Sequence, residues 1–323
     1  YSPSGKEETI SNFLVKEMET LGFRVRKDAI GNVIGEIGQG EPIILLCGHM
    51  DTVAGHLPLR VEKDKIYARG AVDAKGPLAA MVMAAAMVAQ EPAFQAKVVV
   101  ASVVEEEATS RGIKHLINEG LSVDYAIFGE PSGVGNITIG YKGNLHLKLT
   151  CKTETGHSST PWLYENALEK AFELWQKIKN SYPPMEKQES PYYAITACMT
   201  KVSGGKANSV IPFESEMHID VRIPPQLTST QIIDDTQKVI SQYQAANPKV
   251  MVKLAVLDSN EPFEVNKDSI LVRALSSAIR KVQNKPATLL RKTGTGDMNI
   301  LGRAMNLPIV TYGPGDSHLD HTI

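Results

Sequence analysis

The sequence predicts an α/β protein in which a mixed sheet forms the larger domain and a smaller, ferredoxin-like α+β domain is inserted into it. Two observations lead to this prediction. Near both ends of the chain, short apolar runs alternate with helical stretches, as in sheets that are buried on both faces. The middle of the chain instead shows the order β-α-β-β-α-β, which is a complete folding unit of the ferredoxin type. With 323 residues, the chain is long enough for two hydrophobic cores.

The larger domain is expected to begin with a helix, because Ser4 and Glu7 have the spacing of a capping box. A hairpin is expected over residues 25–37, with its turn at Gly31-Asn32. Four apolar runs then predict buried strands, at residues 43–47, 98–104, 125–128 and 309–312. Helices are expected near residues 77–90, 111–119 and 270–282.

The inserted domain is expected to comprise residues 144–258, which leaves residues 1–143 and 259–323 for the larger domain. Its expected strands cover residues 145–151, 196–202, 214–222 and 250–257. Its expected helices cover residues 166–180 and 229–245. The chain therefore crosses between the domains near Asn144 and Asp258.

Composition excludes several classes of function. The net charge of −2 offers no basic surface for nucleic acid. The longest apolar run, residues 78–89, is too short to cross a membrane and is expected to form a buried helix. Cys47, Cys151 and Cys198 are an odd, widely spaced set rather than a disulfide framework, which favours a reducing, cytoplasmic location.

Residues of the types that bind metals follow each of the predicted buried strands. In chain order these are His49, Asp51, Glu105, Glu106, Glu107, Glu130, His318 and His321. Asp73 lies just before the apolar helix. Each group alone is typical of a solvated turn or, for the run Glu105–Glu107, of a solvated helix start. Because sites in open α/β sheets form outside the carboxyl ends of the strands, we expect the groups to converge.

Such a cluster favours metal-assisted hydrolysis, since imidazole and carboxylate are ligands that suit zinc. Asp51, two residues after His49, can accept the second N–H of that imidazole and so orient it. A further carboxylate that is not a ligand can act as a general base. Other mechanisms have less support, because the chain lacks a GxSxG elbow and a P-loop, and Gly294-Thr295-Gly296 lacks the third glycine of a dinucleotide motif.

These residues resemble the co-catalytic zinc amidohydrolases, a family that includes acetylornithine deacetylase, succinyl-diaminopimelate desuccinylase, aminoacylases and glutamate carboxypeptidases. The resemblance covers nearly the whole chain. Its markers are residues 49–53, 69–76, 105–107, 129–132, 156–157, 220–222 and 313–315, with Asn208 and His321. It implies two divalent metal ions, Zn²⁺ or alternatively Co²⁺, and an inserted domain that serves as a lid and for dimerisation.

The resemblance also implies roles for the matched residues. One metal ion is expected to be bound by His49, Asp73 and Glu130, and the other by Asp73, Glu107 and His321. Asp73 thus bridges the ions, and a cis peptide bond is expected between Asp73 and Ala74.

Glu106 resembles the general base, although Glu105 stands where the family usually has Asp. His157 resembles a histidine that stabilises the oxyanion and, in dimeric members, comes from the other subunit. Asn208 and Arg222 resemble substrate-binding positions.

One subgroup resembles this chain more closely at residues 66–78 and 291–301. It releases lysine or ornithine from the C-terminal glutamate of LysW, a small acidic carrier protein, during lysine and arginine biosynthesis. Arg291, Lys292, Gly294 and Thr295 are then expected to bind substrate, while Gly296 replaces the serine that is usual before the aspartate.

Two alternatives stay open. The first is a deacetylase of N-acetyl-lysine or N-acetylornithine, which would need no carrier. The second is an inactive, metal-free relative that only binds or dimerises, and loss of metal ligands would mark it. All the expected ligand residues are present in this sequence.

Overall fold

The computed structural model describes residues 1–321 and divides the chain into two compact units. Unit 1 contains Tyr1–Gly140, Glu264–Arg291 and the segment that starts at Gly296; unit 2 contains Tyr141–Phe263 and Lys292–Thr295. Unit 2 thus extends a few residues beyond both ends of the inserted domain expected from the sequence. It also includes Lys292–Thr295, which were expected in the larger domain. The boundaries of the two folding domains stay a prediction.

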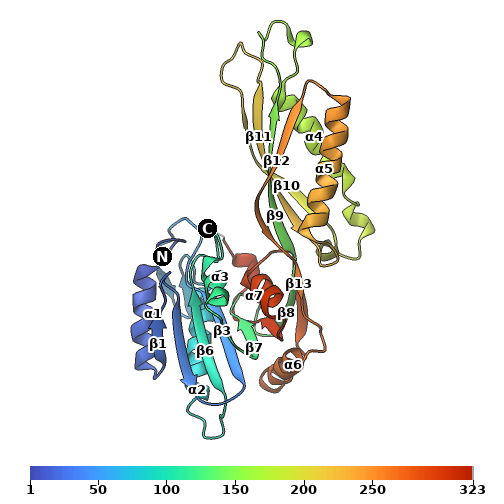
Figure 1. Cartoon of the computed structure of the whole chain (residues 1–323). Coiled ribbons are helices and arrows are strands. Elements are labelled where there is room, and N and C mark those ends of the chain that lie inside the picture. The colour runs from blue at the N-terminus through green and yellow to red at the C-terminus, as the bar shows by residue number, and fades with distance from the viewer. Residues whose placement is uncertain (322–323) are drawn as a thin grey trace. The chain divides into compact units, whose positions relative to one another are not determined.

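Unit 1 is built on the expected mixed sheet (Figure 1). Within the described residues, the sheet has nine strands in the order β1-β2-β6-β3-β7-β15-β8-β13, with β14 paired to β8. Their bounds are Arg24–Lys27 (β1), Val33–Gly38 (β2), Ile43–His49 (β3), Lys97–Val103 (β6), Tyr125–Phe128 (β7), Asn136–Tyr141 (β8), Phe263–Glu264 (β13), Thr288–Lys292 (β14) and Ile309–Thr311 (β15). β3 pairs in parallel with β6 and β7, and β7 pairs in parallel with β15, whereas β1, β2 and β6 pair antiparallel. The predicted fold class is confirmed.

The helices of unit 1 cover this sheet. They are α1 (Glu8–Thr20), α2 (Lys75–Val88), α3 (Arg111–Asn118), α6 (Ile270–Gln283) and α7 (Asp297–Met305). α1 and α2 share one apolar core with β2 and β6, and α6 packs on β8 and β15. A separate hairpin joins β4 (Arg60–Glu62) to β5 (Lys65–Tyr67). None of the helices within residues 1–321 combines the length and the apolar composition needed to cross a bilayer.

The predicted capping box at the first helix is wrong. Helix α1 begins at Glu8, and its N-cap residue Glu7 makes no side-chain bond to the first turn. The hydroxyl of Ser4 donates to the carboxylate of Asp51, and the carboxylate of Glu7 accepts from the amide of Glu105. Both side chains are therefore used by partners that lie far along the chain, and the helix begins without them.

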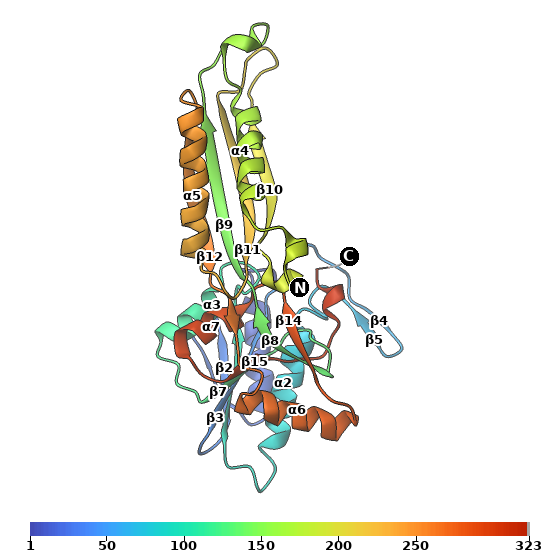
Figure 2. The same ribbon diagram turned by 90° about the vertical axis from the view of Figure 1, so that its right-hand side faces the viewer.

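Unit 2 has the predicted chain order β9-α4-β10-β11-α5-β12 (Figure 2). The strands are β9 (Gly143–Lys152), β10 (Thr196–Gly204), β11 (Glu214–Ile223) and β12 (Met251–Asn260), and the helices are α4 (Ala167–Ser181) and α5 (Ser229–Ala246). The strands form an antiparallel sheet in the order β10-β11-β9-β12. Alternate side chains of β9 and β11 pack against both helices. The side chains between them carry ion pairs such as Lys148–Glu216, so the other face of the sheet is polar.

Candidate metal centre

The parallel strands of unit 1 bring the expected ligand residues to one edge of the sheet. His49 is the last residue of β3, the acidic turn Glu105–Glu107 follows β6, and Glu130 follows β7. β6, β3 and β7 are parallel neighbours, so their carboxyl ends lie at the same edge. Asp73 comes to this edge directly before α2.

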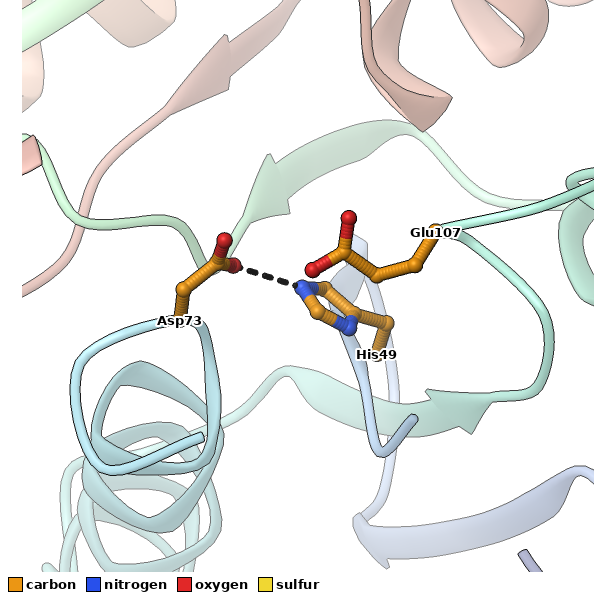
Figure 3. Close-up of side chains that lie close together, drawn as sticks. All are labelled: His49, Asp73 and Glu107. Atoms are coloured by element: carbon orange, nitrogen blue, oxygen red, sulfur yellow. Dashed lines mark hydrogen bonds and ion pairs between the residues drawn. The ribbon is translucent and has the colours of Figure 1, made fainter. Parts of the chain in front are cut away.

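Three of these side chains form a compact cluster of possible ligand atoms. One atom each of His49, Asp73 and Glu107 lies within 4.8 Å of the others. Figure 3 shows the three side chains pointing toward one another, with Nε2 of His49 3.0 Å from Oδ1 of Asp73.

Two further expected ligands adjoin this cluster. Nε2 of His321 lies 3.1 Å from Oδ2 of Asp73 and 3.1 Å from Oε1 of Glu107. Oε1 of Glu130 lies 3.7 Å from Nε2 of His49. The structure thus places all five sequence-predicted ligands together, with Asp73 between the two histidines.

The donor set suits a divalent cation such as zinc, because it consists of imidazole nitrogens and carboxylate oxygens. Burial raises the pKa of Glu107, and the neighbouring Asp73 carboxylate raises it further. Burial also raises the pKa of Glu106 well above its usual range; His49 opposes this, while the carboxylates of Asp297 and Glu130 add to it. Carboxylates crowded in this way would be relieved by a cation, so the residues present fit a metal site.

Asp51 is fully buried beside the cluster and contacts both His49 and the backbone of the acidic turn. Its Oδ1 accepts the backbone N–H of Glu106 at 3.1 Å and lies 3.3 Å from Nδ1 of His49. Its Oδ2 accepts the hydroxyl of Ser4 at 2.6 Å and the N–H of Glu107 at 3.1 Å. Burial alone would raise the pKa of Asp51, but these bonds lower it. Since Nδ1 of His49 faces Asp51, Nε2 is the atom that points into the cluster.

Glu105 and Glu106 have different surroundings. The carboxylate of Glu105 pairs with Arg111 at 3.0 Å and accepts the hydroxyl of Thr109 at 2.6 Å. In residues 1–321, no hydrogen bond or ion pair holds the carboxylate of Glu106, and a Cβ added to Gly296 would lie 3.5 Å from its Oε1. Within residues 1–321, neighbouring side chains therefore hold the carboxylate of Glu105 but not that of Glu106.

The peptide bond between Asp73 and Ala74 is cis, as predicted. A cavity of about 800 Å³ adjoins the cluster within unit 1. Asp73, Glu107 and His321 lie in its wall, together with residues of the β4–β5 hairpin. This volume is typical of a binding site for a small molecule or a short peptide segment.

Two candidate residues lie on exposed loops of unit 2. Nδ1 of His157 accepts the backbone N–H of Ser159 at 3.1 Å, which leaves the proton of the neutral imidazole on Nε2. Asn208 is exposed, and its neighbour Ser209 pairs by its carbonyl with the N–H of Ser158. The loops that carry His157 and Asn208 are therefore adjacent.

The basic residues that are predicted to bind substrate already contact other groups. In unit 2, Arg222 donates to Asp220 at 2.9 Å and to the hydroxyl of Thr295 at 3.4 Å. Nζ of Lys292 lies 6.0 Å from the centre of the Tyr141 ring. Gly294 is also in unit 2, and a Cβ there would meet no atom within 4 Å. In unit 1, Arg291 pairs with Glu264.

Sequence reasoning assigned no role to two buried charged residues. Asp297 begins α7 with both carboxylate oxygens buried, and burial raises its pKa to about 6. Lys142 is fully buried in unit 2 and donates to the carbonyl oxygens of Ala194 and Pro191. Asp297 lies within residues 291–301, which carry the resemblance to the subgroup, and this position was a usable signal. Nothing in the sequence near Lys142 indicated that its side chain is buried.

Known proteins resemble this chain over its whole length. A relative from Pyrococcus furiosus is 38% identical over 322 residues, covering 100% of this chain and 86% of that protein. The LysW-lysine/LysW-ornithine hydrolase of Sulfurisphaera tokodaii is 34% identical over 322 residues, covering 100% of this chain and 85% of that protein.

Solved structures share the fold. A tripeptidase from Staphylococcus aureus has a TM-score of 0.82 at 21% identity, covering 99% of this chain and 88% of that one. A dinuclear metal-binding peptidase from Bacillus subtilis has a TM-score of 0.69 at 16% identity, covering 97% and 84%. The model of the peptidase family M20/M25/M40 matches residues 45–323. This chain, with its cluster of imidazole and carboxylate groups at the strand ends, therefore belongs to peptidase family M20/M25/M40.

Proposed function

We propose that this protein is a two-metal amidohydrolase that releases lysine or ornithine from the C-terminal glutamate of the carrier protein LysW. The observation that carries the hydrolytic part is the cluster of His49, Asp73 and Glu107, to which Glu130 and His321 are adjacent. The substrate is supported by the name of the Sulfurisphaera tokodaii relative, which aligns with the whole of this chain.

We assign His49, Asp73 and Glu130 to one metal ion and Asp73, Glu107 and His321 to the other. Zn²⁺ is the metal we favour, with Co²⁺ as the alternative, because both accept mixed nitrogen and oxygen ligands. When bound, the ions would polarise the carbonyl of the scissile amide and make the attacking water more acidic.

Glu106 moves the proton in this proposal. Its carboxylate takes a proton from the water as the water oxygen attacks the amide carbon. When the carbon–nitrogen bond breaks, Glu106 gives that proton to the departing amine. Asp51 holds the backbone of Glu106 through its N–H, so the carboxylate keeps its place during both transfers.

We assign the remaining candidates to the substrate. His157 would donate its Nε2 proton to the oxyanion, which is consistent with the bond that Nδ1 accepts from Ser159. Asn208 would bind substrate beside it. The positive side chains that would hold substrate carboxylates are Arg222, Arg291 and Lys292, and the loop that would approach the substrate backbone contains Gly294 and Thr295.

We further propose a cytoplasmic homodimer. The three cysteines are free, and two of them, Cys47 and Cys151, are buried, which is typical of proteins in a reducing compartment. Dimerisation through the sheet of unit 2 would use its edge strands, β10 and β12, because its polar face carries ion pairs.

Release of free amino acid from a small substrate panel tests the proposal. The panel contains LysW-linked lysine, LysW-linked ornithine, N-acetyl-lysine and N-acetylornithine, each with added zinc or cobalt. We expect a carrier-linked substrate to have the highest kcat/KM, by roughly tenfold or more, because the C-terminal glutamate of the carrier adds a carboxylate on the acyl side of the amide, which an acetyl group lacks. A preference for the acetyl substrates would replace this function with deacetylation. Two bound metal ions without release from any substrate would indicate a non-catalytic relative.

A further inference from the structure

The segment Ser2–Glu7, here called the N-terminal strap, runs beside the loop that follows β3. The N–H of Thr52 donates to the carbonyl of Ser2 at 2.9 Å, and Pro3 forms a parallel bridge with Thr52. The hydroxyl of Ser2 donates to the carbonyl of Met50 at 2.7 Å. Ser2, Met50 and Thr52 are all buried, so the strap is packed against the segment that directly follows His49.

Ser4 forms a hydrogen bond with Asp51, the residue that contacts His49 and the backbone of Glu107. Its hydroxyl donates to Oδ2 of Asp51 at 2.6 Å. With His49, Glu106 and Glu107, it completes four contacts around the two oxygens of Asp51, which is as many as a carboxylate can accept. Without the Ser4 hydroxyl, a fully buried oxygen would lose one of its donors.

Glu7 holds the start of the same acidic turn. Its Oε1 accepts the N–H of Gly5 at 2.9 Å and the N–H of Glu105 at 3.2 Å. Glu105 has a φ of 56°, in the left-handed region that side chains other than glycine seldom adopt. Three successive N–H groups, those of Glu105, Glu106 and Glu107, are therefore each accepted by a carboxylate, first of Glu7 and then of Asp51.

From this geometry we infer that Ser4 and Glu7 are positioning residues, which hold the Glu105–Glu107 turn and Asp51 in the arrangement that the metal ions need. The inference rests on the proposed metal centre but not on the identity of the substrate. If the turn keeps its shape without metal, Glu106 and Glu107 are already in position when the metal ions bind. The free energy of metal binding is then not reduced by the entropy cost of ordering these side chains. The strap thus takes part in the site although none of its residues is a ligand.

Four variants of the full chain test the inference by their affinity for Co²⁺, measured against a competing chelator, and by the visible absorption of the bound ion. Ser4→Ala should lower the affinity for Co²⁺ roughly tenfold. This is the lower end of the loss in metal affinity that follows when a hydrogen-bonding partner of the ligand shell is removed. Ser4→Thr keeps the hydroxyl and should restore most of it. Glu7→Ala should act like Ser4→Ala. Thr20→Ala is the matched control, since it removes a hydroxyl that, within residues 1–321, bonds to the carbonyl of Lys16 in α1 and to no group of the site.

Kinetics with saturating metal provide the second measurement. The Ser4→Ala variant should have a lower kcat with little change in KM, since Asp51 holds Glu106 but touches no substrate in this scheme. The inference is overturned if Ser4→Ala and Glu7→Ala match Thr20→Ala in Co²⁺ affinity and spectrum, or if Ser4→Thr fails to restore the affinity. It is also overturned, together with the metal centre, if the parent chain binds no Co²⁺. If the parent binds Co²⁺ but cleaves none of the panel, only the proposed substrate fails, and the affinity series still decides the inference.

Discussion

Arg291 and Glu264 form an ion pair in unit 1, with 2.7 Å between Nη2 of the arginine and Oε1 of the glutamate. Nε of Arg291 donates to the same oxygen, also at 2.7 Å. The pair joins β14 to β13, and about a third of the Arg291 side chain is exposed. A carboxylate of the substrate would consequently have to approach an arginine that already holds one carboxylate.

The first prediction separates substrate binding from strand pairing at Arg291. If Arg291 binds a carrier carboxylate, Arg291→Ala should lower kcat/KM for LysW-linked lysine roughly tenfold, because a charge-assisted bond is lost. The value for N-acetyl-lysine should change much less. Glu264→Ala is the matched variant, since it breaks the ion pair but keeps the arginine. Equal losses for both variants and both substrates would show that the pair only holds the strands together.

The second prediction concerns the proton carrier. Glu106→Gln should retain Co²⁺ binding and lower kcat by roughly 10²–10⁴, because an amide cannot take up the proton from water. Glu105→Gln is the control, since its carboxylate faces Arg111 and Thr109, and its kcat should stay within a few-fold of the parent value. A large loss in Glu105→Gln with near-normal kcat in Glu106→Gln would reverse the assignment.

The third prediction tests whether His157 acts in the partner subunit. His157→Ala and Glu106→Gln should each be nearly inactive alone. Mixed after dissociation and reassembly, they should regain about a quarter of the parent activity, since half of a random mixture is heterodimer and one site of each heterodimer is intact. Activity that stays at the sum of the two variants would mean that His157 serves its own subunit or none. The mass of the mixed species in solution provides the control for assembly.

The fourth prediction concerns the buried Lys142 and the pH dependence of stability. Burial lowers the pKa of Lys142 to about 8, and the nearby Arg222 contributes to this. The ordinary lysine pKa of about 10.4 applies in the unfolded chain, so between these two values the unfolded state binds more protons than the folded state. The contribution of Lys142 to the free energy of unfolding should therefore rise, by roughly 1–3 kcal/mol, as the pH increases from about 8 to about 10.

Urea unfolding monitored by tryptophan fluorescence measures this effect, because both tryptophans, Trp162 and the buried Trp175, are in unit 2. Lys142→Met should remove the rise between pH 8 and 10. Lys238→Met, at an exposed position where the lysine pairs with Asp235, should leave it unchanged. Parallel pH curves for the parent and Lys142→Met would refute the prediction.

The sequence by itself determined the fold class, the β-α-β-β-α-β order of unit 2 and the candidate ligands. These features follow from local patterns, because runs of apolar residues report buried strands, and side chains such as His49 and Glu130 directly follow such runs. Parallel neighbours end at the same edge, so residues after β3, β6 and β7 had to converge. The family is confirmed by the match over residues 45–323.

Only the tertiary structure decided which partners the polar side chains take. The spacing of Ser4 and Glu7 is equally compatible with a helix cap and with long-range bonds, and packing of the strap against Asp51 and Glu105 selected the bonds. The burial of Lys142 depends in the same way on a loop some fifty residues later, at Pro191 and Ala194. The physical reason is that a hydrogen-bond donor or acceptor must find a partner once it is buried, and which partner lies within reach is fixed by segments that meet only when the chain is folded.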